Sequence, residues 1–252
     1  MTDIEKTNLL FFASEASADD NEKYKKIRTN FLNASLVRKL TVEAVGTYAL
    51  ALVATSSGSI IIVGFVLTAL IYAFGHISGG HFNPAVTMAV FLRGNLVDMR
   101  TAVAYAAAQI TGAFIGGAQH KFALTDKGLT FGDGNFPTVA TNASAGSAFL
   151  SELTATMIFT TVILNVATTR TQAKNQFFGI AIGFVLIGAA SSINDVSGGC
   201  LNPALGLALT ALSGQTDDMW IYLVAPLIGG AFGAGVFRLT ADPSEFEENK
   251  SK

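Results

Sequence analysis

Two short stretches interrupt an otherwise apolar chain in the same way. The first, "HISGGHFNPAV", spans residues 76–86, and the second, "DVSGGCLNPAL", spans residues 195–205. Each carries a serine, two glycines and an Asn-Pro-Ala triplet in the same order, and a short apolar run follows. Short apolar segments broken by glycine and proline at matching places indicate two related halves of one membrane fold.

Each triplet has the chemistry of an abrupt helix start. Asparagine is a favoured N-cap because its side-chain oxygen accepts a hydrogen bond from the first helical turn. Proline suits the first helical position, where its missing N–H would have no partner in any case. The sequence therefore predicts that a helix begins at each triplet; the residues are Asn83, Pro84 and Ala85, and Asn202, Pro203 and Ala204.

The rest of the chain has the composition of a membrane protein. Half of its 252 residues are apolar and only 13% are charged, against about 25% in a typical soluble domain. A membrane-spanning helix needs about 20 mostly apolar residues. Six segments meet this length and two apolar segments are too short: 38–57, 59–78, 101–123, 146–168, 176–195 and 219–239, and then 84–93 and 203–213.

These segments predict an all-α membrane protein with six transmembrane helices and two half-helices in an inverted repeat. We expect a channel domain over residues 37–240, with halves at about 37–123 and 146–240. Three spans separate equivalent points, so the second half is inverted. Residues 1–36 and 241–252 are read as tails on the cytoplasmic side, because most lysines and arginines then lie inside.

Inversion brings both helix starts to the middle of the membrane. Each start carries a partial positive charge, and each asparagine keeps an amide group that can donate. Irregular backbone at that depth is tolerated where it lines a water-filled cavity. We expect backbone carbonyls to line a pore above and below this centre, from Gly79, Gly80, His81, Phe82, Gly198, Gly199, Cys200 and Leu201.

The sequence resembles the aquaporin family, also called the major intrinsic proteins. The stretches "GHISGGHFNPAVT" (75–87) and "SGGCLNPA" (197–204) carry the resemblance, with support from "AYAAAQITGAFIGG" (104–117) and "WIYLVAPLIGGAFGAG" (220–235). It covers about residues 38–239. The resemblance implies six helices and two half-helices around one pore per subunit, a homotetramer, and conduction of water with or without glycerol-like solutes.

One position departs from the family pattern. Most aquaporin-like proteins place an arginine directly after the second triplet, where it forms part of a narrow filter, and here that residue is a leucine. By the family's offsets, the four filter positions are Val63, Ala190, Gly199 and Leu205. All four are apolar or small. The resemblance therefore implies a filter without arginine, aromatic or imidazole.

Two consequences compete. The filter is either wide enough for glycerol- or urea-like solutes, which we favour, or apolar and poorly wetted. A structural or junctional membrane protein with a poorly conducting pore is the alternative function, and an ion-leaky channel is a third. Water and glycerol flux into proteoliposomes separates a channel from a structural protein, and current across a planar bilayer under a salt gradient reveals an ion leak.

Several other residues need a role. Buried carboxylates are costly inside a membrane unless they are bonded or protonated, so we expect Glu43 and Glu152 to accept hydrogen bonds from the irregular backbone. Gln109 and His76 are expected to give structural support. Asn142 begins a glycosylation sequon. We expect no catalysis, cofactor, metal or nucleic acid; the expected partners are water, small neutral solutes and membrane lipid.

Overall fold

The computed structural model describes residues 35–129 and 136–246. In these residues the chain forms eight α-helices and two short 3-10 helices: α3 Leu36–Ser57, α4 Ile60–Ser78, α5 Pro84–Arg93, α6 Met99–Asp126, α7 Ala145–Thr168, η1 Arg170–Gln172, α8 Phe178–Ser197, α9 Pro203–Ser213, α10 Met219–Thr240 and η2 Pro243–Glu245. The expected N-terminal tail, residues 1–36, lies almost wholly outside the described residues.

The predicted fold class is confirmed. Each of the six long apolar segments forms one long helix, and each of the two short segments forms one short helix. The largest difference is α6, which begins earlier and ends later than its apolar stretch. Its start is set by Asp98, whose side chain accepts a hydrogen bond from the Thr101 N–H, and this bond lowers the pKa of the Asp98 carboxyl.

Four of the described helices, α4, α7, α8 and α10, are long and apolar enough to span a membrane on their own. The other two long helices, α3 and α6, carry more polar side chains. They pack extensively on each other, and α3 buries Glu43 and Thr47 while α6 buries Gln109. Tertiary packing therefore covers the polar side chains that make these two helices less apolar.

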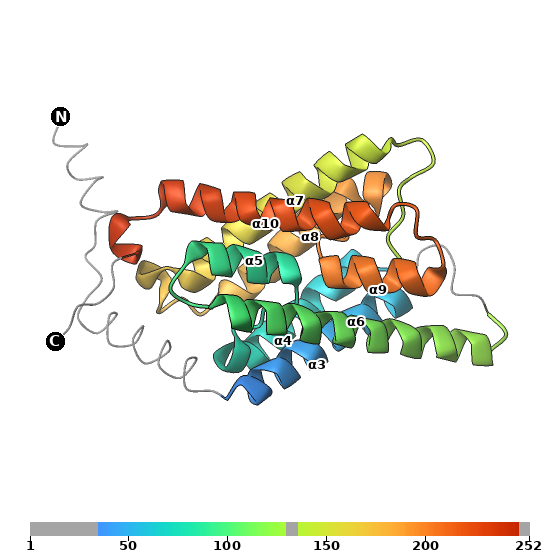
Figure 1. Ribbon diagram of the computed structural model, residues 1–252, viewed down its shortest axis with the longest axis horizontal. Coiled ribbons are helices and arrows are strands. Elements are labelled where there is room, and N and C mark those ends of the chain that lie inside the picture. The colour runs from blue at the N-terminus through green and yellow to red at the C-terminus, as the bar shows by residue number, and fades with distance from the viewer. Residues whose placement is uncertain (1–34, 130–135, 247–252) are drawn as a thin grey trace.

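The helices pair in a pattern that repeats between the halves. In the first half α3 packs on α6, and in the second half α7 packs on α10. Contact between α4 and α8 joins the halves. The start of α3 and the end of α10 lie at the same end of the molecule, at the left of Figure 1. We call this the terminal end, and the opposite one the far end.

The two short helices lie end to end in the middle of the bundle. Figure 1 shows α5 and α9 in line between α10 and α6, with their first residues near the centre and their last residues toward opposite ends. Each half-helix packs against a long helix of the other half, α5 on α10 and α9 on α6. The half-helices thus join the halves as well as occupying the centre.

Glycines bring the paired helices close together. A Cβ added at Gly112 of α6 would collide with the Ala44 carbonyl of α3, and one at Gly116 would collide with the Tyr48 carbonyl. The equivalent pair on α10, Gly229 and Gly233, faces α7 in the same way. Such contact between backbones is typical of helix pairs in membranes, where packing rather than the hydrophobic effect holds helices together.

The C-terminal segment differs from the tail expected over residues 241–252. Residues 241–246 pack back onto the terminal end of the bundle, with the Glu245 side chain buried. The physical reason is a buried partner, because the Glu245 carboxylate forms an ion pair with Arg93 of α5. Residues 247–252 lie outside the described part of the chain.

We expect Gly112→Ala to destabilise the protein, because the new methyl group overlaps the α3 backbone. Overpacking of this kind costs about 1–3 kcal/mol. The measurement is the melting temperature of the purified protein in detergent. Gly235→Ala on α10 is the matched control, since its Cβ would meet nothing within 4 Å. An equal melting temperature for the two variants would contradict the close packing of α3 on α6.

Candidate pore

The site is built on the first residues of α5 and α9. Asn83 accepts a hydrogen bond from the Ala85 N–H at 2.8 Å, and Asn202 accepts one from the Ala204 N–H at 3.0 Å. Each helix therefore begins at its triplet, as predicted. Because the two helices lie end to end, their partial positive charges face each other at the centre.

The asparagine amides also join the two halves directly. The Asn83 Nδ2 donates to the Leu201 carbonyl at 2.8 Å, and the Asn202 Nδ2 donates to the Phe82 carbonyl at 3.0 Å. Each amide nitrogen carries two hydrogens and each carbonyl oxygen has two lone pairs. The pair of bonds thus fixes both asparagines and still leaves each amide one further hydrogen to donate.

A buried carboxylate holds the backbone that precedes α5. Glu43 of α3 is fully buried, and its Oε1 accepts from the Ser78 hydroxyl at 2.6 Å and from the His81 N–H at 3.0 Å. Its Oε2 accepts from the Phe82 N–H at 2.6 Å and from the Gln109 Nε2 at 2.8 Å. The irregular stretch therefore finds its hydrogen-bond partners inside the protein.

A second carboxylate does the same before α9. Glu152 of α7 is fully buried and accepts from the Ser197 hydroxyl at 2.8 Å, the Cys200 N–H at 2.9 Å and the Leu201 N–H at 2.8 Å. The partners are the repeat equivalents of those of Glu43. Among the described residues, Glu152 has no counterpart of the Gln109 bond, because Pro226 occupies the equivalent position on α10.

The residues before the two asparagines have an unusual backbone. Phe82 has a φ of 49° and Leu201 a φ of 51°, both in the left-handed region that L side chains rarely adopt. Such a conformation costs of order 1–3 kcal/mol and persists only where the surroundings impose it. Here the carboxylate bond to each N–H and the asparagine bond to each carbonyl impose it from both sides.

Two tyrosines support the same loops and were not predicted as site residues. Tyr105 donates its hydroxyl to the Ser78 carbonyl at 2.8 Å, and Tyr222 donates to the Ser197 carbonyl at 2.9 Å. Both side chains are buried. Tyr105 of α6 and Tyr222 of α10 are as far apart in the sequence as Gly112 and its equivalent Gly229. An alignment of α6 with α10 would therefore have identified the two tyrosines from the sequence.

A cavity lies on each side of the central asparagines. The terminal-end cavity has a volume of about 320 Å³ and the far-end cavity about 370 Å³. Gly79, Gly80 and His81 line the first, and Gly198, Gly199 and Cys200 line the second. The other two residues of the expected carbonyl rows, Phe82 and Leu201, are fully buried, and their carbonyls accept from the asparagines.

The other two side chains expected to give structural support, Gln109 and His76, lie near the terminal-end cavity or the loop that borders it. Gln109 donates to Thr87 Oγ1 at 3.0 Å as well as to Glu43. His76 lines the cavity with an exposed side chain. The ring of His81 is buried, and its Nδ1 lies 3.1 Å from Thr87 Oγ1.

The four residues at the filter positions all line the far-end cavity. Val63, Ala190, Gly199 and Leu205 come from three different helices and a loop, and the fold brings them together. A fifth residue of this cavity wall was not predicted from the sequence. Phe136, from the connection between α6 and α7, lines the same cavity, is buried, and belongs to the same apolar cluster as Leu205.

The segment that carries Phe136 is held against the second pore loop. The Ala140 N–H donates to the Val196 carbonyl at 3.0 Å. A Cβ added at Gly198 would come within 3.2 Å of the Pro137 Cα and the Thr138 nitrogen. These contacts fix the position of Phe136 relative to the loop. The sequence repeat that identified the two pore loops does not include Phe136, so it could not identify this residue.

Comparisons with known proteins agree on one family. A model of the major intrinsic protein family matches residues 9–237. The chain is 34% identical over 224 residues to "Nodulin-26" of Glycine max, covering 83% of this chain and 80% of that protein. It is 34% identical over 212 residues to "Glycerol uptake facilitator protein-like 6" of Lactiplantibacillus plantarum, covering 79% and 95%.

A solved structure shows the same fold. The X-ray structure of the aquaglyceroporin from Plasmodium falciparum aligns with a TM-score of 0.72 and 22% sequence identity. The alignment covers 84% of this chain and 99% of that one.

We expect Glu152→Ala to destabilise the protein, because the N–H groups of Cys200 and Leu201 lose their acceptor. A buried donor without a partner costs about 1–3 kcal/mol, so the melting temperature in detergent should fall by several degrees. Asp217→Ala, an exposed acidic residue at the same end, is the control. If both variants melt like the wild type, the carboxylate does not hold the loop.

Proposed function

Because the chain belongs to the major intrinsic protein family, we propose that it is a passive channel for water and small uncharged solutes such as glycerol or urea, with a filter that lacks arginine. The family is one of membrane channels for water and small solutes, so the chain is an integral, multi-pass membrane protein.

The observation that carries the proposal is the pair of cross-bonded asparagines between two cavities. At this point the two helix starts and the two amide groups supply positive potential and donors. A neutral molecule with lone pairs is attracted by such donors, whereas a cation is repelled. A column of water or polyol therefore suits this centre.

The far-end cavity supports a preference for uncharged solutes. None of its lining residues in the described part of the chain is charged, and its polar side chains are Ser59, Thr138 and Asn194. The four filter positions contribute small or aliphatic groups. The four filter positions carry no aromatic side chain, but Phe136 places one beside Leu205. We therefore infer a filter that is apolar on one side and narrower than the four positions alone predict.

The charge pattern and the family support a proposal for the orientation and the assembly of the protein. We propose that the terminal end faces the cytoplasm, because Arg93, Arg170 and Arg238 lie there and positive residues favour the inside. A homotetramer with one pore per subunit, surrounded by lipid, is the proposed assembly. The exposed large apolar side chains, which include Phe65, Phe122 and Phe184, supply surface for such contacts.

Stopped-flow measurements on proteoliposomes test the function. We expect water and glycerol to cross faster than in empty vesicles. Flux equal to that of empty vesicles for every solute tested would instead favour a structural membrane protein with a closed pore. Current across a planar bilayer under a salt gradient tests for an ion leak, and we expect none.

Leu205→Arg should lower glycerol flux more than water flux, because a long charged side chain narrows the filter and adds a donor. We expect about a tenfold fall for glycerol, equivalent to a barrier higher by about 1.4 kcal/mol, and a smaller fall for water. Leu205→Met nearly conserves volume and is the control, with an unchanged ratio of the two fluxes. Equal effects of arginine on both solutes would argue against a filter at this position.

Phe136→Ala should raise glycerol flux relative to water flux, because it removes the aromatic ring from the cavity. We expect the ratio to rise by about three- to tenfold, or a barrier lower by about 0.7–1.4 kcal/mol. Phe149→Ala is the control, since Phe149 stacks on Trp220 and is not among the cavity-lining residues. An unchanged ratio for Phe136→Ala would remove this residue from the filter.

A further inference from the structure

The same three residues, Asn-Ala-Ser, precede the first helix of each half. One copy spans residues 33–35 and the other spans residues 142–144. Each copy stands equally far along the chain before the buried glutamate of its half, Glu43 or Glu152. The triplet is therefore part of the internal repeat. It is also an acceptor sequence for an N-linked glycan, because the asparagine is followed by a residue other than proline and then by serine.

The last residue of each triplet caps the helix that follows. The Ser35 hydroxyl accepts a hydrogen bond from the Arg38 N–H of α3 at 3.4 Å, and the Ser144 hydroxyl accepts one from the Ser147 N–H of α7 at 3.1 Å. Residues 33 and 34 lie outside the described part of the chain. Because α3 begins at the terminal end and α7 at the far end (Figure 1), the inverted repeat places the two serines at opposite ends of the molecule.

Asn142 has the surroundings that a glycan needs. The residue is exposed, and within the described part of the chain its side chain takes part in no hydrogen bond. The backbone around it forms a tight turn, in which the Ala143 N–H donates to the Ala140 carbonyl at 2.9 Å. An N-linked glycan is bulky and hydrophilic, so it requires a surface position. An exposed asparagine at a turn can carry one without disturbing the packing of the helices.

The turn that carries Asn142 is anchored on both sides. Before it, the Ala140 N–H donates to the Val196 carbonyl of α8 at 3.0 Å. After it, Ser144 is held as the cap of α7. Asn142 is not among the residues that line the far-end cavity. The structure thus fixes this asparagine at the far-end surface, outside the cavity wall.

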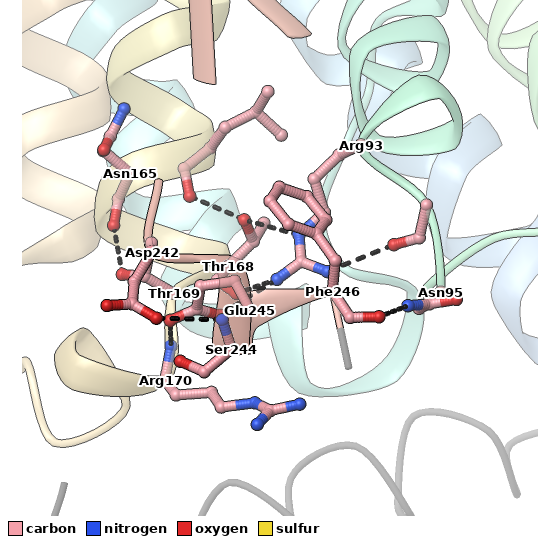
Figure 2. Close-up of polar contacts among 12 residues, drawn as sticks. Arg93, Asn95, Asn165, Thr168, Thr169, Arg170, Asp242, Ser244, Glu245 and Phe246 are labelled. Carbon is pink, nitrogen blue, oxygen red and sulfur yellow. Dashed lines mark hydrogen bonds and ion pairs between the residues drawn. The ribbon is translucent and has the colours of Figure 1, made fainter. Parts of the chain in front are cut away.

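The orientation of the chain decides which acceptor sequence can be modified, because oligosaccharyltransferases act on the side of the membrane that faces away from the cytoplasm. Arg93 and Arg170 lie at the terminal end, beside residues 242–246 (Figure 2), and positive residues favour the cytoplasmic side. The far end then faces the lumen. A third acceptor sequence, Asn249-Lys250-Ser251, follows α10 in the chain. It lies outside the described residues and, like residues 33–35, reports on the terminal end.

We propose that Asn142 is an N-glycosylation site and that Asn33 and Asn249 stay unmodified. In the reaction, the Asn142 Nδ2 forms a bond to C1 of the first sugar of a lipid-linked oligosaccharide pyrophosphate and loses one proton. The bond between that C1 and the pyrophosphate oxygen breaks, and the lipid pyrophosphate leaves. The inference rests on the orientation given under the proposed function, and it is independent of which solutes the pore conducts.

The experiment translates the full chain in the presence of microsomes that contain an oligosaccharyltransferase. We expect a single shift to higher mass on a gel, which peptide N-glycosidase removes. That enzyme leaves an aspartate where the glycan was attached, so mass spectrometry identifies the modified position, which we expect to be 142. Asn142→Gln should lose the shift completely. Asn33→Gln and Asn249→Gln are the matched controls and should keep it.

Ser144→Asp separates the glycan acceptor from the helix cap. Aspartate caps a helix about as well as serine, so α7 should form normally, but the acceptor sequence has lost its hydroxyl. We expect this variant to show no shift. Ser144→Thr keeps both the hydroxyl and the cap and should be modified like the wild type. A shift in Ser144→Asp would mean that the triplet is not the acceptor.

The outcomes separate this inference from the proposed function. Modification of Asn33 or Asn249 instead of Asn142 overturns the proposed orientation together with the inference. A chain that resists alkaline extraction from the microsomes and carries no glycan at any of the three positions overturns the inference alone. Flux into proteoliposomes tests conduction separately, and its result does not depend on the glycan.

Discussion

The structure depends on two buried carboxylates. Glu43 and Glu152 accept hydrogen bonds from backbone N–H groups that no helix can use, at a depth where there is no bulk water to replace them. Without these acceptors the loops before α5 and α9 would carry unpaired donors. With them, Phe82 and Leu201 are held in a left-handed backbone, and each asparagine faces the opposite half.

The two halves are equivalent in architecture but not in polar detail. In the first half Gln109 bonds to both Glu43 and Thr87, and the His81 ring lies beside Thr87. In the second half a proline replaces the glutamine, and Cys200 donates its thiol to the Asn202 carbonyl. The first loop thus has more internal polar contacts, while the second borders the cavity that contains the filter positions.

The charge distribution matches the physical demands on a pore for neutral molecules. Positive potential at the centre comes from helix ends and amides, which are partial charges, and the far-end cavity is lined by uncharged side chains in the described residues. At the terminal end, Arg93 is buried, forms an ion pair with Glu245, and donates to the carbonyl of Thr168, which lines the cavity.

The sequence by itself determined the helices, their inversion and the central triplets. These features are local: apolar length sets a spanning helix, and Asn-Pro sets a helix start wherever the chain is in space. Only the tertiary structure placed Phe136 beside Leu205 and paired Arg93 with Glu245, 152 residues away. The sequence repeat does not relate the segments that these two contacts join. The packing of whole helices decides which of their side chains meet, and no local sequence pattern records that packing.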